Sequence, residues 1–398
     1  MRKMKLLLPA LAISTILITG CKKEFDDSNH VPAQLQNEST NAKRTKLSAA
    51  QLQSKFDQLR SVLALENKSH LLTNPDLKIM QEPGYRELVQ NATAVVPTPC
   101  DPNTPISLWL DDQLADWNSI VFQYADNTAM FELPTYDAFV FENSSANQYF
   151  GKDGEYTQIL VKTFKDLKRF WDIESDNIVL VGMHGSMLRD RDKLIRTYIA
   201  VYGLSPAAAA QFADFVLLLL DTFPQYRNGD HPIFTFNAFA LETFEFPPYG
   251  IIPDKIVMGD GIMEAYTAIG FGDVAPQAIL AHEFGHHIQL ELDLFGPFTP
   301  EETRRTELMA DAYSAYYLSH ARGASMQWKR VQQFLEVFFN IGDCAFTNPN
   351  HHGTPTQRMA AAEWAYNLAN DAQKQGHILT AEEFTILFDA ALPGILQQ

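Results

Sequence analysis

Cysteine is scarce in this chain: only three of its 398 residues are cysteine. Cys21, Cys100 and Cys344 stand far apart, and none belongs to the short paired spacing that zinc fingers use. Structural zinc sites usually close with four protein ligands, mostly cysteines. The cysteines alone therefore cannot build such a site, which disfavours a structural zinc protein.

Positive charge is also in deficit, since 31 Lys and Arg residues face 48 Asp and Glu residues, a formal net charge of −17. A nucleic-acid-binding protein needs a basic face, and docking on anionic lipid needs one as well. The composition therefore argues against nucleic acid as a partner. Hydrophobic residues make up 46% of the chain, enough for a substantial core.

Long hydrophobic runs are missing too. The apolar run at 6–20 is too short for a comfortable membrane span and follows three basic residues, a pattern typical of a signal peptide at 1–20. Its end, Ile18-Thr19-Gly20-Cys21, resembles the lipobox of bacterial lipoproteins. That resemblance implies cleavage before Cys21, a lipid anchor on Cys21, and an outer-membrane lipoprotein of a Gram-negative cell envelope, periplasmic or surface-exposed. An ordinary secretion signal is the alternative.

The expected compartment determines the oxidation state of the remaining two cysteines. In an oxidising environment, Cys100 and Cys344 are expected to form one disulfide. Two buried free thiols are the alternative, because sequence does not show that their Cα atoms come within reach.

Domain organisation is indicated by changes in composition. Residues 21–105 are polar and then proline-rich, so we expect a lipidated tether and an extended connection, with one short amphipathic helix at 47–65. Residues 106–398 are expected to be one globular domain. A strand-bearing half followed by a helical half predicts an α+β fold that is helix-rich, with a small sheet. Helices are expected at 156–172, 206–223, 274–293, 301–322, 325–340, 355–373 and 381–390. Asp273 is expected to cap the third of these helices, and Gly296-Pro297 is expected to stop it.

The segment AHEFGHHIQL at 281–290 carries the clearest chemistry. His282 and His286 are four apart, so on a helix they share one face, nearly opposite an apolar stripe. Two neutral imidazoles suit Zn²⁺ and leave room for a water. Glu283 is rotated away from the ligand positions and is expected to act as general base on that water. A helix that carries histidines by chance is the alternative.

Two further residues of this segment, Gly285 and His287, are not expected to be ligands or catalytic groups. Gly285 lies in mid-helix, where glycine costs about 1 kcal/mol against alanine, so we expect another backbone to approach there. His287 is expected to be incidental, as are His184, His231 and His351.

The third ligand is expected from a second helix. Glu307 and Asp311, four apart in RRTELMADAYSAYYL, sit among apolar residues that argue against a solvated face. Glu307 would complete a His₂Glu zinc site with an open fourth position. Asp311 would accept the N–H of a ligating imidazole. An ordinary solvated face is the alternative.

Three segments resemble a known family in residues and order: AYTAIGFGDVAPQAILAHEFGHHIQ, RTELMADAYSAYYL and IGDCAFTNPNHHGTPTQR. Over about 230–370 the chain is similar to the bacterial neutral zinc metallopeptidases, which resemble gluzincin-type peptidases. The resemblance implies a zincin-like catalytic domain and, more weakly, zinc-dependent endopeptidase activity. It covers none of 22–200.

The third of these segments also resembles the histidine–arginine block of integral-membrane zinc peptidases. It implies that His352 supports the oxyanion and that Arg358 either does the same or braces the loop. Alternatively, Gly353-Thr354 caps a helix and His352 merely packs.

Two expectations concern the substrate. In zincins a peptide adds to an edge strand, and 255–263 is the best candidate for it. The chain is thus expected to be a membrane-tethered zinc endopeptidase acting on proteins or peptides. A catalytically idle zincin-like chaperone or assembly factor of the envelope is the competing hypothesis, and the intact Glu283 argues against it.

Overall fold

A computed structural model of the chain describes residues 47–66, 104–297, 299–340, 353–375 and 377–398. The predictions for the signal peptide, Cys21, Cys100, Cys344, His351 and His352 fall outside the described residues. The fold is rich in helices and has a small mixed sheet, which confirms the α+β class.

The elements follow one another without internal repetition. The helices before the central strand are α1 (Ala49–Leu65), α3 (Pro105–Gln113), α4 (Ser119–Asn127), α5 (Leu133–Phe141), α6 (Thr157–Phe170), α7 (Arg191–Tyr202) and α8 (Pro206–Thr222). Those after it are α9 (Asp260–Ala268), α10 (Ala275–Glu291), α11 (Pro300–Ser319), α12 (Trp328–Asn340), α13 (Pro355–Gln375) and α14 (Ala381–Ile395). The strands are β1 (Val179–Met183), β2 (Ala238–Leu241), β3 (Phe244–Glu245), β4 (Ile251–Ile252) and β5 (Lys255–Gly259), and short 3₁₀ helices are η3 (Gly185–Arg189), η4 (Pro224–Gly229) and η5 (Pro232–Thr235).

The larger sheet has the strand order β1-β5-β2, with β5 parallel to β1 and antiparallel to β2. The expected edge strand at 255–263 is therefore wrong, because 255–259 is the central strand and α9 begins at Asp260. Gly259 and Gly261 in this segment pack against the chain's own backbone. A Cβ at Gly259 would lie 2.1 Å from the Thr235 carbonyl oxygen, and one at Gly261 would lie 1.9 Å from that of Pro232. The chain's own backbone occupies the space that a substrate was expected to use.

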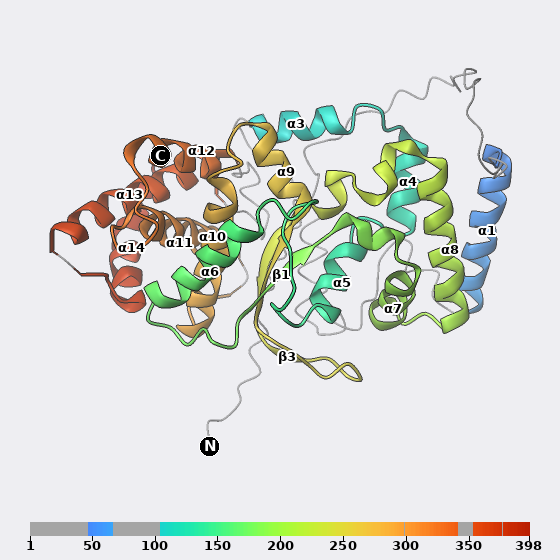
Figure 1. Cartoon of the computed structure of the whole chain (residues 1–398), viewed down its shortest axis with the longest axis horizontal. Coiled ribbons are helices and arrows are strands. Elements are labelled where there is room, and N and C mark those ends of the chain that lie inside the picture. The colour runs from blue at the N-terminus through green and yellow to red at the C-terminus, as the bar shows by residue number, and fades with distance from the viewer. Residues whose placement is uncertain (1–46, 67–103, 298, 341–352, 376) are drawn as a thin grey trace.

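The sheet lies in the middle of the molecule (Figure 1). Helices α4, α5, α7, α8 and α1 gather on one side of it, and helices α6 and α10–α14 gather on the other. Helix α10 packs against α6, α11 and β2, so it is enclosed between the sheet and the C-terminal helices.

Helix α8 forms as the sequence predicts. Ser205 accepts a hydrogen bond from the Ala208 amide at 3.2 Å and Pro206 occupies the first turn. Phe215, Val216 and Leu219 of the FVLLLL run are buried in the core.

Helix α10 starts and ends differently from the prediction. Asp273 was expected to cap it, but its carboxylate pairs with Arg330 of α12 at 2.9 Å, and Val274 precedes the helix without a side-chain cap. The helix ends at Glu291, ahead of the predicted stop at Gly296-Pro297. The chain turns off at Asp293, whose φ is 53°.

Helix α1 belongs to the folded body. Leu52, Phe56, Leu59 and Leu63 are buried, and the helix packs against α8. Its start is fixed by Ser48 and Gln51, which form a capping box.

No single helix of the described residues is long and apolar enough to cross a membrane, although the bent pair Pro206–Thr222 and Pro224–Thr235 passes by length and composition.

Candidate metal centre

Helix α10 is buried on both faces. The sequence predicts a histidine face nearly opposite an apolar stripe, but every residue from Ala275 to Gln289 except Gln277 is buried. The side chains of His282 and His286 are only 6% and 4% exposed. The reason is that α6 and β2 cover one side of the helix while α11 covers the other.

Helix α11 approaches α10 at Gly285, which confirms the expected close contact. A Cβ at Gly285 would lie 3.1 Å from Ala310 Cα and 3.3 Å from the Ala310 carbonyl oxygen. A hydrogen bond also joins the two helices, since Ser314 Oγ of α11 donates to the Ala278 carbonyl of α10 at 2.8 Å. The absent side chain at 285 lets the two helices meet closely enough for their polar groups to share one site.

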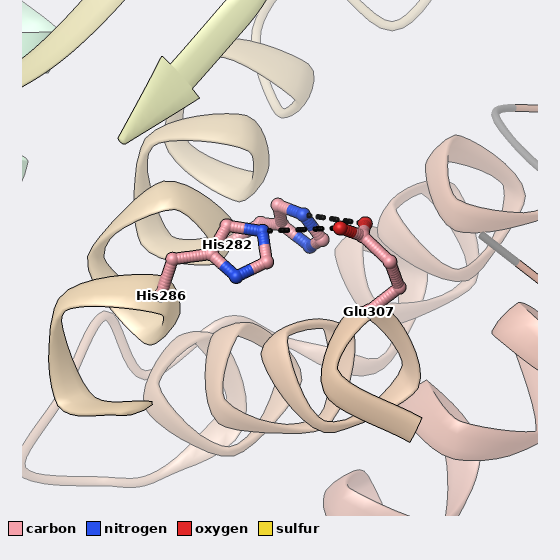
Figure 2. Close-up of side chains that lie close together, drawn as sticks. All are labelled: His282, His286 and Glu307. Atoms are coloured by element: carbon pink, nitrogen blue, oxygen red, sulfur yellow. Dashed lines mark ion pairs between the residues drawn. The ribbon is translucent and has the colours of Figure 1, made fainter. Parts of the chain in front are cut away.

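His282, His286 and Glu307 come together at this crossing and form a group that could hold a metal ion, their ligand atoms lying within 4.8 Å of one another. Figure 2 shows both imidazoles directed at the Glu307 carboxylate. His282 Nε2 is 3.4 Å from Glu307 Oε2, and His286 Nε2 is 3.4 Å from Glu307 Oε1. Two ligand atoms at about 2.1 Å from a tetrahedral ion lie about 3.4 Å apart. The donor set therefore fits a small divalent cation.

Behind His282, a chain of charged groups extends to α13. His282 Nδ1 is 2.8 Å from Asp311 Oδ1, so the carboxylate accepts its proton, and Nε2 is directed toward Glu307. Arg358 then donates to Asp311 twice, from Nε at 2.7 Å and from Nη2 at 2.6 Å. Arg358 thus braces the carboxylate that orients the first histidine.

Behind His286 lies Gln289, a residue that the sequence reasoning missed. His286 Nδ1 is 2.9 Å from Gln289 Oε1, and Gln289 Nε2 donates to the Thr306 carbonyl at 2.6 Å. The available signal was the three-residue spacing on one helix face, together with an amide among apolar residues.

Electrostatics favour a cation between these groups. Glu307 and Asp311 are buried carboxylates, and Arg358 lies 2.6 Å from Asp311 and 3.9 Å from Glu307. Buried carboxylates are costly unless cationic partners face them. A divalent ion bound by Glu307 would be such a partner.

The two histidines respond to this field in opposite directions. Burial lowers the pKa of His286 to about 4. Burial also acts to lower the pKa of His282, but hydrogen bonds and charge from Asp311 and Glu307 outweigh it and raise this pKa to about 10. The metal-free centre therefore holds a proton on His282, and a metal ion would displace it.

Three other histidines, His287, His231 and His184, have partners outside this group, as expected. His287 Nε2 is 3.0 Å from the Lys255 carbonyl oxygen on β5, and His231 Nε2 is 3.0 Å from that of Gln113. His184 Nδ1 pairs with Asp260 at 2.9 Å.

The histidine–arginine block is described only in part. Thr354 Oγ1 accepts from the Gln357 amide at 3.1 Å, and Gly353, with φ 96°, turns the chain into α13. Gly353-Thr354 thus forms the helix cap that was one of the two expectations. The role of His352 stays a prediction.

Comparison of the chain with protein-family models, with curated proteins and with solved structures found no match.

Proposed function

We propose that this chain is a zinc-dependent endopeptidase of the bacterial cell envelope, tethered to the membrane through Cys21. The observation that carries the proposal is the meeting of His282, His286 and Glu307, with Glu283 one residue beyond the first ligand on the same helix. Two imidazoles and one carboxylate are the ligand set of catalytic zinc sites, which leave a fourth position open. The substrate class would be proteins or peptides.

Zinc, when bound, would polarise a peptide carbonyl and make water acidic enough to attack near neutral pH. Glu283 would take the proton from the attacking water and hand it to the leaving amine. Asp311 and Arg358 would hold His282 in its ligating orientation, and His352 would donate to the oxyanion.

A second candidate is a catalytically idle zincin-like chaperone or assembly factor of the envelope. The observation that favours it is enclosure, since the side chain of Glu307 is 1% exposed and those of the two histidines are nearly as buried. Under this alternative the metal would stabilise the fold, and Glu283 would have no proton to carry.

The variant Glu283→Gln distinguishes the endopeptidase from the catalytically idle protein. The variant keeps the size of the side chain but removes its basicity, so we expect normal zinc content and cleavage of an unfolded protein mixture reduced at least 100-fold. Zinc content would be measured by elemental analysis and cleavage by mass spectrometry. Equal cleavage by the native protein and by Glu283→Gln would show that Glu283 is not the general base. If both proteins bind zinc and neither cleaves, the result would favour the catalytically idle chaperone or assembly factor.

A further inference from the structure

Gln289 connects the second histidine of the metal centre to the helix that carries Glu307. Its side chain is fully buried, with one end at His286 and the other at the Thr306 carbonyl. Thr306 directly precedes Glu307, so this amide spans the crossing that Gly285 makes possible.

The carbonyl determines which way the amide faces. A backbone carbonyl oxygen can only accept a hydrogen bond, so the group 2.6 Å from Thr306 is the NH₂ end of Gln289. The other end is therefore the oxygen Oε1, which can only accept from His286 Nδ1. It follows that Nδ1 of His286 carries the proton and that Nε2 presents its lone pair toward Glu307.

We infer that Gln289 is a positioning residue that fixes the tautomer and ring orientation of His286 for metal binding. This inference rests on the metal site of the proposed function but not on peptide cleavage. Loss of such a partner behind a metal-ligating histidine typically weakens metal binding about 10- to 100-fold.

The described histidines outside the centre adopt both arrangements. In His231, His287 and His320, Nε2 faces a backbone carbonyl, so Nε2 carries the proton. His184 directs Nδ1 at Asp260 instead. His287 is next to His286 in the chain and is held in the opposite tautomer.

The choice of an amide also suits the charge of the centre. His282 already has a carboxylate behind it, that of Asp311, and the Glu307 carboxylate faces both imidazoles. Gln289 orients the second imidazole without adding a further negative charge.

The test uses Gln289→Met, which keeps the length of the side chain but cannot accept from Nδ1 as an amide does. Gln277→Met is the matched control on the same helix, since Gln277 donates to the Asp273 carbonyl one turn before it. Zinc affinity is measured by competition with a chelator. Histidine tautomers are read in the zinc-free protein by ¹⁵N NMR, with His287 as the internal reference.

We expect the native protein to show the Nδ1 proton on His286 and the Nε2 proton on His287. In Gln289→Met, the His286 signal should shift toward the other tautomer and zinc affinity should fall about 10- to 100-fold, while Gln277→Met binds as the native protein does. A native His286 with its proton on Nε2 would overturn the inference, and so would equal zinc affinity in the two variants. If Gln289→Met fails to fold, the native tautomer still decides. A native protein that binds zinc without cleaving peptides contradicts only the proposed function.

Discussion

At the scale of single residues, each ligating histidine is held by the nitrogen that faces away from the metal position. His282 has a charged partner in Asp311, and His286 has a neutral partner in Gln289. Both partners leave Nε2 toward Glu307. We therefore expect the metal affinity of the centre to depend on residues that do not touch the metal.

Asp311→Asn tests the charged partner. The amide can still accept from His282, but its NH₂ end then faces the donors of Arg358, so we expect zinc affinity to fall about 10- to 100-fold. Asp389→Asn is the control, because Asp389 pairs with Arg305 at the surface. Affinity is measured by chelator competition, and identical values for the two variants would contradict this role of Asp311.

The pH dependence of the zinc-free protein follows from the two histidine pKa values. The pKa of His282 is raised to about 10, so its contribution to stability is complete below the unfolded value of 6.5 and is lost as pH rises through about 10. The pKa of His286 is lowered to about 4, so stability declines as pH falls from 6.5 toward 4. We expect the contribution of these two histidines to the unfolding free energy of the zinc-free protein to be largest near pH 6.5.

Urea unfolding across this pH range, compared with that of His282→Ala, checks the alkaline half of the curve. A His282→Ala variant that loses stability above pH 6.5 as steeply as the native protein would contradict the account.

At the scale of elements, the centre depends on how closely α10 and α11 cross. Gly285→Val would place a branched side chain against Ala310, where even a Cβ lies only 3.1 Å from the neighbouring Cα. Overpacking of this kind costs about 1–3 kcal/mol. We expect a lower melting temperature together with weaker zinc binding, because separated helices move Glu307 away from the histidines.

Gly394→Val in α14 is the control, since a Cβ there meets no atom within 4 Å. Both variants replace a helical glycine with valine, but only Gly285→Val meets a neighbouring backbone, so the difference between them in thermal unfolding and zinc affinity reports the effect of crowding. Unchanged zinc affinity in Gly285→Val would show that the crossing does not set the geometry of the centre.

The sequence predicts the parts of this centre that follow from the geometry of a single helix, and it misses those that depend on contacts between distant elements. His282, His286 and Glu307 are predictable because helical spacing puts side chains on a common face. The capping of α10 by Asp273 was wrong because Arg330, distant in sequence, takes its carboxylate. The edge position of 255–259 was wrong because strand order depends on which distant strands pair with it. Gln289 was missed because its function requires a carbonyl from another helix.

At the scale of the whole molecule, α1 lies at one end, and α10 and α11, which carry the candidate metal centre, lie on the far side of the sheet from it (Figure 1). Phe56 of α1 is 5% exposed and its ring stacks on Phe215 of α8, with centroids 5.8 Å apart. Phe56→Ala should reduce the free energy of unfolding by about 3–5 kcal/mol but leave zinc affinity unchanged. Denaturant unfolding and chelator competition measure the two effects.

Leu65→Ala on the same helix is the control, because Leu65 is 86% exposed. Equal stability of the two variants would show that α1 is not packed against the body, and a loss of zinc affinity in Phe56→Ala would show that α1 and the metal centre are coupled.

The central claim is that one divalent ion binds between α10 and α11. Anomalous diffraction at the zinc edge, from crystals of the protein grown with zinc, locates that ion directly. We predict a single strong peak per chain, among the Nε2 atoms of His282 and His286 and the carboxylate of Glu307. No peak at this position, or a peak only at other residues, would contradict the account.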